Sequence, residues 1–436
     1  MFNDGFMTEW SIIRSVSTVD LPTLAWPGPE PTAQVLTEDV LSALAKRIAD
    51  NGSTSKAELV RLTRLPRSTV TTHVDWLLNR GVIVRAADKG PLRRGRPADH
   101  VELNGEIAAV IAIEMGVVNT TVALVDLRGR ILARHRVRLA TEQGPDRALR
   151  SLADTVDAVF TEAHDEGHVT PPRSRCVTSI AVPARVDSRT RSPMRPTVIP
   201  SWDGFPMGQM LETLLGCPAL LEDDCSVRAV GEAGHLGPDS LPLIAIQLGT
   251  GIGAGIVDGN GDIFRGANGS AGDVGHIPCT GAEDVLCNCG ARGCVEAAAA
   301  VPAMLKRLEA AGLADHDTDL RGSDLLAHLL RGRDPHVTQV VREGAEKLGE
   351  VVATLCNVLN PRRVVITSAL ASVSHDVLAG VRSVVYERAR ALATKDLVID
   401  YSTLGDDVGI AGAYLIGRRY LLAATNIKQL RVAPAA

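Results

Sequence analysis

His276 and three of the four cysteines between residues 272 and 296 have the spacing of a metal site, and this stretch restricts the fold more than any other part of the chain. Zinc in a structural site takes four His or Cys ligands at tetrahedral corners, and glycines between the cysteines allow the backbone to turn around an ion. The alternative is four buried or free side chains in a glycine-rich loop. We predict a structural Zn²⁺ site with the ligands His276, Cys287, Cys289 and Cys294.

Length and composition restrict the class of protein. A chain of 436 residues is too long for one ordinary domain and indicates two or three. No apolar run reaches the roughly 18 residues that a membrane-spanning helix needs, and the N-terminus lacks the basic start and apolar core of a secretory signal. Eight cysteines in a chain of this size do not make a disulfide scaffold. We therefore expect a cytoplasmic protein with no membrane partner.

Charge is distributed unevenly along the chain. The whole chain has a net charge of −5, yet residues 37–100 contain 12 Lys/Arg against 7 Asp/Glu. A basic N-terminal segment on an acidic body indicates that this segment alone contacts a polyanion.

The N-terminal pattern predicts a winged helix-turn-helix over residues 37–103. Residues 1–36 are rich in proline and lack periodicity, so we expect a poorly ordered arm. Apolar spacing then predicts helices at 37–51, 55–62 and 68–79 and a strand at 82–84. The third helix would present short donors and one cation to phosphates and base edges. These candidate DNA contacts are Arg67, Ser68, Thr69, Thr71, Thr72 and His73.

A basic segment follows this helix at residues 89–97. Arg93, Arg94 and Arg96 surround a glycine between two prolines, which is typical of a cationic wing that enters a narrow minor groove. A three-helix protein-interaction module with a solvated basic loop is the alternative. The position of the basic segment directly after the third helix favours DNA binding.

From residue 104 to 425, apolar strands alternate with helices, which predicts two α/β lobes with a crevice between them. The residues after 425 form a tail, 426–436. The main strands are expected at 109–113, 121–125, 179–182, 219–221, 243–248, 363–367 and 397–399, and the helices at 149–164, 207–215, 226–234, 295–311, 323–330, 335–359, 376–393 and 408–422.

Three groups of residues in these lobes suggest ligand chemistry. Asp223 and Asp224 follow a strand, where a carboxylate can accept a sugar hydroxyl or act as a general base, although acidic residues also favour a helix N-terminus. Asp273 and His276 form a second polar pair, and one ring nitrogen of the histidine could bind zinc while the other donates to a ligand. A glycine-rich segment after residue 248 is typical of a phosphate loop or of a tight hairpin with glycines at positive φ. Its candidate residues are Gly249, Thr250, Gly251 and Gly253.

These motifs together resemble the ROK family, which groups bacterial sugar kinases with sugar-responsive repressors. The most specific match is Gly-Asp-x-Gly-His at 272–276 followed by Cys-x-Cys-Gly-x-x-Gly-Cys-x-Glu at 287–296. The resemblance covers about 37–422, and the winged helix is similar to the repressor branch. It implies an α/β fold in which the winged helix-turn-helix precedes a two-lobed, actin-like and sugar-kinase-like (ribonuclease H-like) ATPase-type domain.

The resemblance also implies roles for individual residues. Asp224 corresponds to the family's catalytic base, Asp223 to a sugar-binding asparagine and Asp273 to a sugar-binding glutamate. His276 corresponds to a residue that binds both sugar and zinc, and Glu296 to a further sugar contact.

Two nucleotide-binding elements depart from the kinase pattern. Family kinases have Asp-x-Gly-Gly-Thr where this chain has Glu114-Met-Gly-Val-Val-Asn119, and glycines where it has Thr367-Ser-Ala-Leu370. Asp224 is then a vestigial base in a non-catalytic protein. We predict a DNA-binding transcriptional regulator, a repressor, that binds a double-stranded operator as a homodimer or homotetramer and responds to a sugar or sugar derivative. An active ATP-dependent sugar kinase is the alternative, and an activator is also compatible with the sequence.

Overall fold

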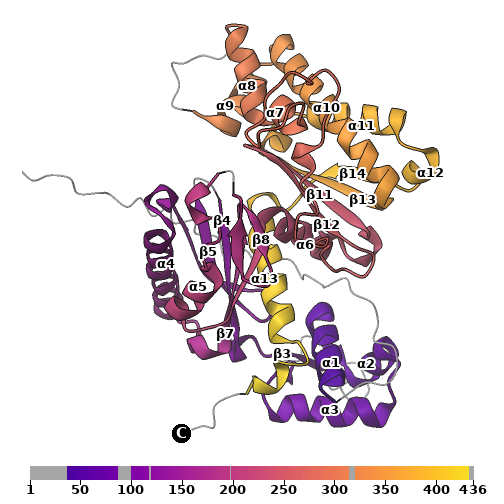
Figure 1. The fold of residues 1–436 in the computed structure, drawn as a ribbon. Coiled ribbons are helices and arrows are strands. Elements are labelled where there is room, and N and C mark those ends of the chain that lie inside the picture. The colour runs from indigo at the N-terminus through magenta and orange to yellow at the C-terminus, as the bar shows by residue number, and fades with distance from the viewer. Residues whose placement is uncertain (1–36, 87–99, 117–118, 197, 314–319, 432–436) are drawn as a thin grey trace, which may run out of the picture.

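The computed structural model describes residues 37–86, 100–116, 119–196, 198–313 and 320–431 (Figure 1). The predicted arm at 1–36 and the basic wing, with Arg93, Arg94 and Arg96, lie outside the described residues. Within them, no helix is both long and apolar enough to cross a membrane.

The N-terminal part is a winged helix-turn-helix, as predicted. Its elements are α1 (Thr37–Asn51), β1 (Thr54–Ser55), α2 (Lys56–Thr63), α3 (Arg67–Asn79), β2 (Ile83–Arg85) and β3 (His100–Leu103), with the three strands in the order β1-β3-β2. The Ser55 side chain caps α2 by accepting the backbone N–H of Glu58 at 3.2 Å, which confirms the predicted helix start. Val70, Val74 and Leu77 turn one face of α3 into the core.

The first lobe is built on a five-stranded sheet in the order β10-β7-β4-β5-β6. The parallel strands β4, β7 and β10 end at the same edge, which places Asp223 at the C-terminal edge of the sheet. The elements are β4 (Ala109–Met115), β5 (Thr120–Asp126), β6 (Ile131–Val137), α4 (Pro145–Asp165), β7 (Cys176–Val182), α5 (Met207–Leu215) and β10 (Ala219–Asp223). A small hairpin, β8 (Arg185–Asp187) with β9 (Ser192–Met194), lies between β7 and α5 in the sequence and was not predicted.

The second lobe has a four-stranded sheet in the order β12-β11-β13-β14. Its strands are β11 (Leu243–Leu248), β12 (Ile252–Val257), β13 (Arg363–Thr367) and β14 (Val398–Tyr401), and its helices are α7 (Val295–Ala299), α8 (Val301–Ala310), α9 (Gly322–Arg331), α10 (Pro335–Leu359), α11 (Asp376–Arg388) and α12 (Ala391–Thr394). Two predicted helices are therefore divided. The helix predicted at 295–311 breaks at Ala300, which is extended (ψ 160°) and is the N-cap of α8. Pro302 lies in the first turn of α8, where its missing N–H is tolerated, whereas it would interrupt a continuous helix. The helix predicted at 376–393 breaks at Ala389, which is also extended (ψ 152°).

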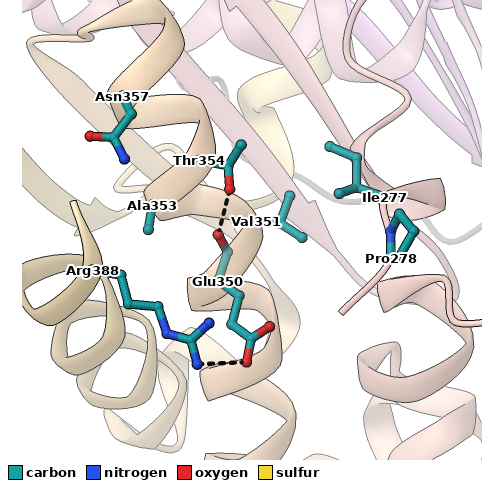
Figure 2. A pocket seen from close by; sticks show the side chains of 8 residues that line it. All are labelled: Ile277, Pro278, Glu350, Val351, Ala353, Thr354, Asn357 and Arg388. Carbon is teal, nitrogen blue, oxygen red and sulfur yellow. Dashed lines mark hydrogen bonds and ion pairs between the residues drawn. The ribbon is translucent and has the colours of Figure 1, made fainter. Parts of the chain in front are cut away.

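An open pocket of about 190 Å³ separates the middle of α10 from the segment that follows His276 (Figure 2). Glu350 of α10 forms an ion pair with Arg388 of α11 at 3.2 Å and accepts the backbone N–H of Thr280 at 3.0 Å. Ile277 and Pro278 line the opposite side. These contacts fix the segment after His276 against α10.

Two helices pass between the lobes and bring their backbones together (Figure 1). They are α6 (Asp224–Leu236) and α13 (Val408–Leu421). A Cβ atom at Gly231 would overlap the Val408 carbonyl oxygen, and one at Gly412 would overlap the Val227 carbonyl oxygen. Only glycine permits this approach at both positions.

The winged helix-turn-helix packs against the C-terminal end of α13. Arg418 forms a buried ion pair with Asp50 of α1 at 2.9 Å, and the Ser42 hydroxyl donates to the Leu422 carbonyl at 2.6 Å. The buried residues of α1 and α13 belong to one continuous apolar core. One helix, α13, thus joins the first lobe to the winged helix-turn-helix.

Replacing Gly412 by alanine should destabilise the protein by about 2–3 kcal/mol, because α6 and α13 must separate to admit the methyl group. Chemical denaturation measures the free energy of unfolding. Gly259→Ala is the control, since no atom lies within 4 Å of a Cβ at that position. Equal stability of the two variants would show that the helices do not need this contact.

Candidate functional site

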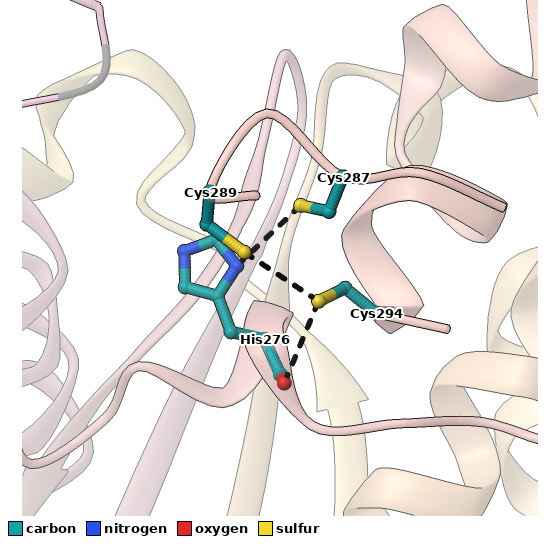
Figure 3. A group of neighbouring side chains, drawn as sticks. All are labelled: His276, Cys287, Cys289 and Cys294. Carbon is teal, nitrogen blue, oxygen red and sulfur yellow. Dashed lines mark hydrogen bonds between the residues drawn. The ribbon is translucent and has the colours of Figure 1, made fainter. Parts of the chain in front are cut away.

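The four predicted metal ligands come together at one point in the second lobe (Figure 3). Their donor atoms all lie within 4.8 Å of one another. Cys289 Sγ lies 3.7 Å from Cys294 Sγ, and Cys287 Sγ lies 3.7 Å from His276 Nδ1. Sulfur atoms on a tetrahedral zinc, with bonds of about 2.3 Å, lie about 3.8 Å apart. The donor types and their separations therefore fit a metal ion.

Local backbone structure holds three of these ligands in place. The Cys287 N–H donates to Ala291 O at 2.8 Å, which closes a turn that contains Gly290 at φ 91°. Cys287 and Cys294 are buried and Cys289 is exposed. Cys294 is also the residue directly before α7, so the metal cluster fixes the start of the helix that carries Glu296.

Glu296 bonds the glycine-rich hairpin between β11 and β12. Its Oε2 accepts the Ile252 N–H at 2.9 Å and would lie 2.7 Å from a Cβ at Gly251. The predicted tight hairpin is present, because β11 and β12 pair antiparallel with Leu248 opposite Ile252. The positive φ expected for its glycines is wrong, since none of Gly249, Gly251 and Gly253 is in that region. Gly251 and Gly253 serve close packing, since a Cβ at Gly253 would lie 2.7 Å from Cys225 Sγ, whereas a Cβ at Gly249 would have no atom within 4 Å.

Asp223 and Asp224 lie at the junction of β10 and α6. Asp223 is the N-cap of α6 and accepts the Ser226 N–H at 3.0 Å. Asp224 is half-buried, and its Oδ1 accepts the N–H of Cys225 at 2.9 Å. The helix N-terminus interpretation is therefore confirmed, and the ligand interpretation stays a prediction.

An arginine that the sequence analysis missed joins two of the predicted ligand-binding carboxylates. Arg185 of β8 donates from Nη1 to Asp223 at 2.9 Å and from Nε to Asp273 at 2.7 Å. No periodicity or motif marks Arg185. The available signal was indirect: a carboxylate at 223, in place of the family's neutral amide, needs a cation nearby when it is buried.

Burial raises the pKa of Asp223 to about 6, while the guanidinium of Arg185 opposes this shift. The neighbouring carboxylate of Asp224 acts in the same direction as burial. The negative charge of Asp223 is therefore held in place at a cost, and Arg185 is the group that reduces that cost.

Glu114 occupies the position at which the kinase pattern has its first aspartate. It forms an ion pair with Arg228 of α6, and burial raises its pKa. A Cβ at Gly409 would overlap the Glu114 carboxylate, so the first turn of α13 packs directly on it. This carboxylate is enclosed by α6 and α13.

The candidate DNA-binding residues of α3 divide by exposure. Arg67, Ser68 and Thr72 are exposed, whereas Thr69, Thr71 and His73 are half-buried. His73 Nδ1 lies 2.8 Å from the Thr69 carbonyl, which orients the ring along the helix.

Asp223 makes a pH-dependent contribution to stability. A folded-state pKa of about 6, above the ordinary 3.8, means that the folded protein binds more protons between these values. The contribution of Asp223 to the free energy of unfolding is therefore greatest below about pH 4 and decreases as the pH rises to about 6. Above about pH 6 this contribution no longer changes. Chemical denaturation across this range should show Asp223→Asn gaining stability relative to the parent protein.

The control is Asp187→Asn in the neighbouring hairpin. The backbone N–H of Arg189 lowers the pKa of Asp187, so this variant should show no such change between pH 4.5 and 6. A flat difference for Asp223→Asn over the same range would contradict the raised pKa.

Comparison with known proteins finds relatives among repressors and sugar kinases. The chain is 28% identical over 381 residues to a putative xylose repressor of Caldicellulosiruptor sp. (strain Rt8B.4), covering 85% of this chain and 92% of that protein. It is 26% identical over 313 residues to a glucokinase of Halalkalibacterium halodurans, covering 69% and 92%.

Solved structures similar to this chain also include a transcriptional regulator and a sugar kinase. A ROK family transcriptional regulator described as a homologue of E. coli MLC superposes with a TM-score of 0.75 at 20% identity, covering 90% of this chain and 98% of that one. A Streptomyces griseus glucokinase in complex with glucose and AMPPNP gives 0.58 at 26% identity, covering 72% and 100%. The ROK family pattern itself matches residues 110–419, and the chain belongs to the ROK family.

Proposed function

We propose that this ROK family protein is a DNA-binding transcriptional repressor whose operator affinity is controlled by a sugar or sugar derivative bound between its lobes. The observation that carries this proposal is the attachment of the winged helix-turn-helix to α13 through Asp50 and Arg418. The opposite end of α13 packs on Glu114 in the crevice. A ligand that changes the relation between the lobes therefore acts on the helix that carries the DNA-binding fold.

The extent of the similarity to relatives supports regulation. Xylose repressors align with 84–85% of this chain, whereas the glucokinases align with 69–70%. The additional length includes the region before residue 110, where the winged helix lies. A relative described as the dual regulator NagC of Escherichia coli also covers 89% of this chain.

The crevice offers the groups that a sugar needs. Asp224 and Asp273 would accept hydroxyl hydrogens, and His276 would donate from the ring nitrogen that does not face the cysteines. Asp223 forms an ion pair with Arg185. Glu296 accepts the Ile252 N–H of the glycine-rich hairpin. Sugar binding relieves repression only if the sugar binds the DNA-incompetent arrangement more tightly.

We assign Zn²⁺ to the cluster of His276 and the three cysteines. With four protein ligands and no open position, the ion would serve as a structural centre. The chain's own residues then do the work of recognition: the cluster holds His276 at the crevice and starts α7 at the position that places Glu296 on the hairpin.

An active sugar kinase is the second candidate, because Asp224 is half-buried at the crevice and available as a base. Two features oppose it. Glu114 is paired with Arg228 at the position of the first phosphate-binding turn, and the hairpin amide of Ile252 is bonded to Glu296. Robust ADP formation from ATP with hexoses or amino sugars would overturn the regulator-only proposal.

As a regulator, the protein would act as a homodimer or homotetramer, because helix-turn-helix proteins read two half-sites about one DNA turn apart. Arg67, Ser68 and Thr72 of α3 would face the major groove, with Arg93, Arg94 and Arg96 in the wing.

Replacing Arg94 and Arg96 together by alanine should weaken DNA binding by roughly tenfold or more and reduce the salt slope by about two. Fluorescence anisotropy on duplexes enriched from a random-sequence pool measures both. Lys306→Ala with Arg331→Ala is the control, since both residues are exposed on the second lobe, away from the winged helix (Figure 1). Unchanged binding by the wing variant would reject the wing as a DNA contact.

Replacing Cys289 by serine should abolish stoichiometric zinc and reduce the sugar-induced rise in melting temperature. Cys289 is exposed, so this change leaves the apolar core intact. Native mass spectrometry measures the metal content, and a thermal-shift titration measures the sugar response. Cys217→Ala in the first lobe should retain both. A wild-type sugar response in a zinc-free Cys289→Ser variant would break the link between metal and ligand recognition.

A further inference from the structure

Arg185 is held by one carboxylate from each lobe. Asp223 belongs to β10 of the first lobe, and Asp273 precedes the short 3-10 helix Val274–His276 of the second. The side chains of Arg185 and Asp223 are 14% and 10% exposed, whereas that of Asp273 is 47% exposed. The guanidinium therefore covers Asp223 and leaves Asp273 accessible.

The two ion pairs differ in what they connect. The pair with Asp223 lies within the first lobe, since β8 follows β7 directly in the sequence and β10 pairs with β7. The pair with Asp273 crosses to the second lobe, where the Gly272 carbonyl accepts the N–H of Ala254 in β12 at 2.9 Å. Breaking the second pair removes a contact between the lobes, and breaking the first leaves a buried charge.

The charge of Asp223 and the presence of Arg185 explain each other. A carboxylate with a nearly buried side chain requires a cation or a proton, and Arg185 is the cation that its oxygen contacts. A neutral amide at 223 would make no such demand. Asp223 and Arg185 are thus a matched pair.

We propose that Arg185 is a specificity-determining residue of the sugar site, and that it competes with the ligand for Asp223 and Asp273. This inference rests on the proposed sugar-binding function and deepens it. A ligand between the lobes must take at least Asp273 from the guanidinium, because this carboxylate is the accessible member of the bridge. The ion pair across the crevice thereby sets a threshold that only well-placed hydroxyl groups overcome.

The charge balance of the crevice selects the class of ligand. Asp223 and Asp273 contact Arg185, while Asp224 interacts with Arg228. With the neighbouring pairs Glu114–Arg228 and Glu222–Arg265, five carboxylates stand against three guanidinium groups, so the local charge is negative. Phosphate and carboxylate groups on a sugar are disfavoured by this potential. Hydroxyl groups are suited to it, since each can donate to a carboxylate and accept from the guanidinium. The site is therefore matched to an uncharged, hydroxyl-rich sugar.

Isothermal titration calorimetry with D-xylose, D-glucose, N-acetylmannosamine and glucose 6-phosphate tests the competition. In the double variant Arg185→Leu with Asp223→Asn, the competing cation and the charge that needs it are both removed. The affinity for an uncharged sugar should rise by roughly threefold to tenfold, the range for removing a partly buried ion pair. Arg185→Leu alone should lower the melting temperature, and the added Asp223→Asn should restore it, which gives a double-mutant cycle.

Arg189→Leu is the matched control, because Arg189 lies in the turn of the same hairpin and its side chain is 88% exposed. Its sugar affinity should equal that of the parent protein. Unchanged or weaker binding of every uncharged sugar by the double variant would overturn the competition. Tight binding of glucose 6-phosphate that is lost in Arg185→Leu would also overturn it, since Arg185 would then be an anion receptor.

Anisotropy with enriched DNA duplexes separates this inference from the proposed function. If the parent protein bound no DNA, the proposal of a DNA-binding regulator would be rejected, independently of the role of Arg185. DNA binding that responds to a sugar, with an Arg185→Leu, Asp223→Asn variant of unchanged sugar affinity, would reject the competition and leave the regulator intact. The strongest support for the competition would be a sugar that binds the double variant and does not bind the parent protein.

Discussion

The contact between α6 and α13 is the constraint on which the arrangement of this protein depends. Carbonyl oxygens of each helix lie where the other has a glycine, at Gly231 and Gly412, so the two helices form a single unit. Both sheets pack against this unit, and the winged helix-turn-helix is attached to its end through Asp50 and Arg418. In the proposed regulator, a change in the angle between the lobes would be resisted by this contact and would be felt where α13 meets α1.

Ion pairs cross or line the crevice at three levels around this unit. Glu114 meets Arg228 at the base, Arg185 joins Asp223 to Asp273, and Glu222 of β10 meets Arg265 beyond β12. Ion pairs of low exposure contribute little net stability, because desolvation of both charges offsets their attraction. Their effect is on specificity: each pair is satisfied in one arrangement of the lobes, so a ligand that engages a carboxylate changes the balance between arrangements.

The sequence predicted what is encoded locally and missed what depends on distant contacts. The cluster of His276 and three cysteines was predictable because the cysteines lie in one short loop, and α1 to α3 because their apolar residues recur at helical spacing. Arg185 is 38 residues from Asp223 and 88 from Asp273, so no local pattern announces the bridge. The break at Ala300 was missed because Pro302 lies inside an otherwise helical apolar pattern. The roles of the crevice residues and the contacts of the wing stay predictions.

Loss of phosphoryl transfer and retention of a sugar site are consistent demands on a regulator. A repressor reports the concentration of its effector only if binding leaves the effector unchanged, and a kinase would consume it. The Glu114–Arg228 pair occupies the position of a phosphate-binding turn and braces α6 against β4. The carboxylate of Asp224 can then remain as a hydroxyl acceptor without a phosphoryl donor nearby. In the proposed regulator, Glu114 would therefore replace a nucleotide contact by a contact with the two helices through which ligand binding would reach the winged helix-turn-helix.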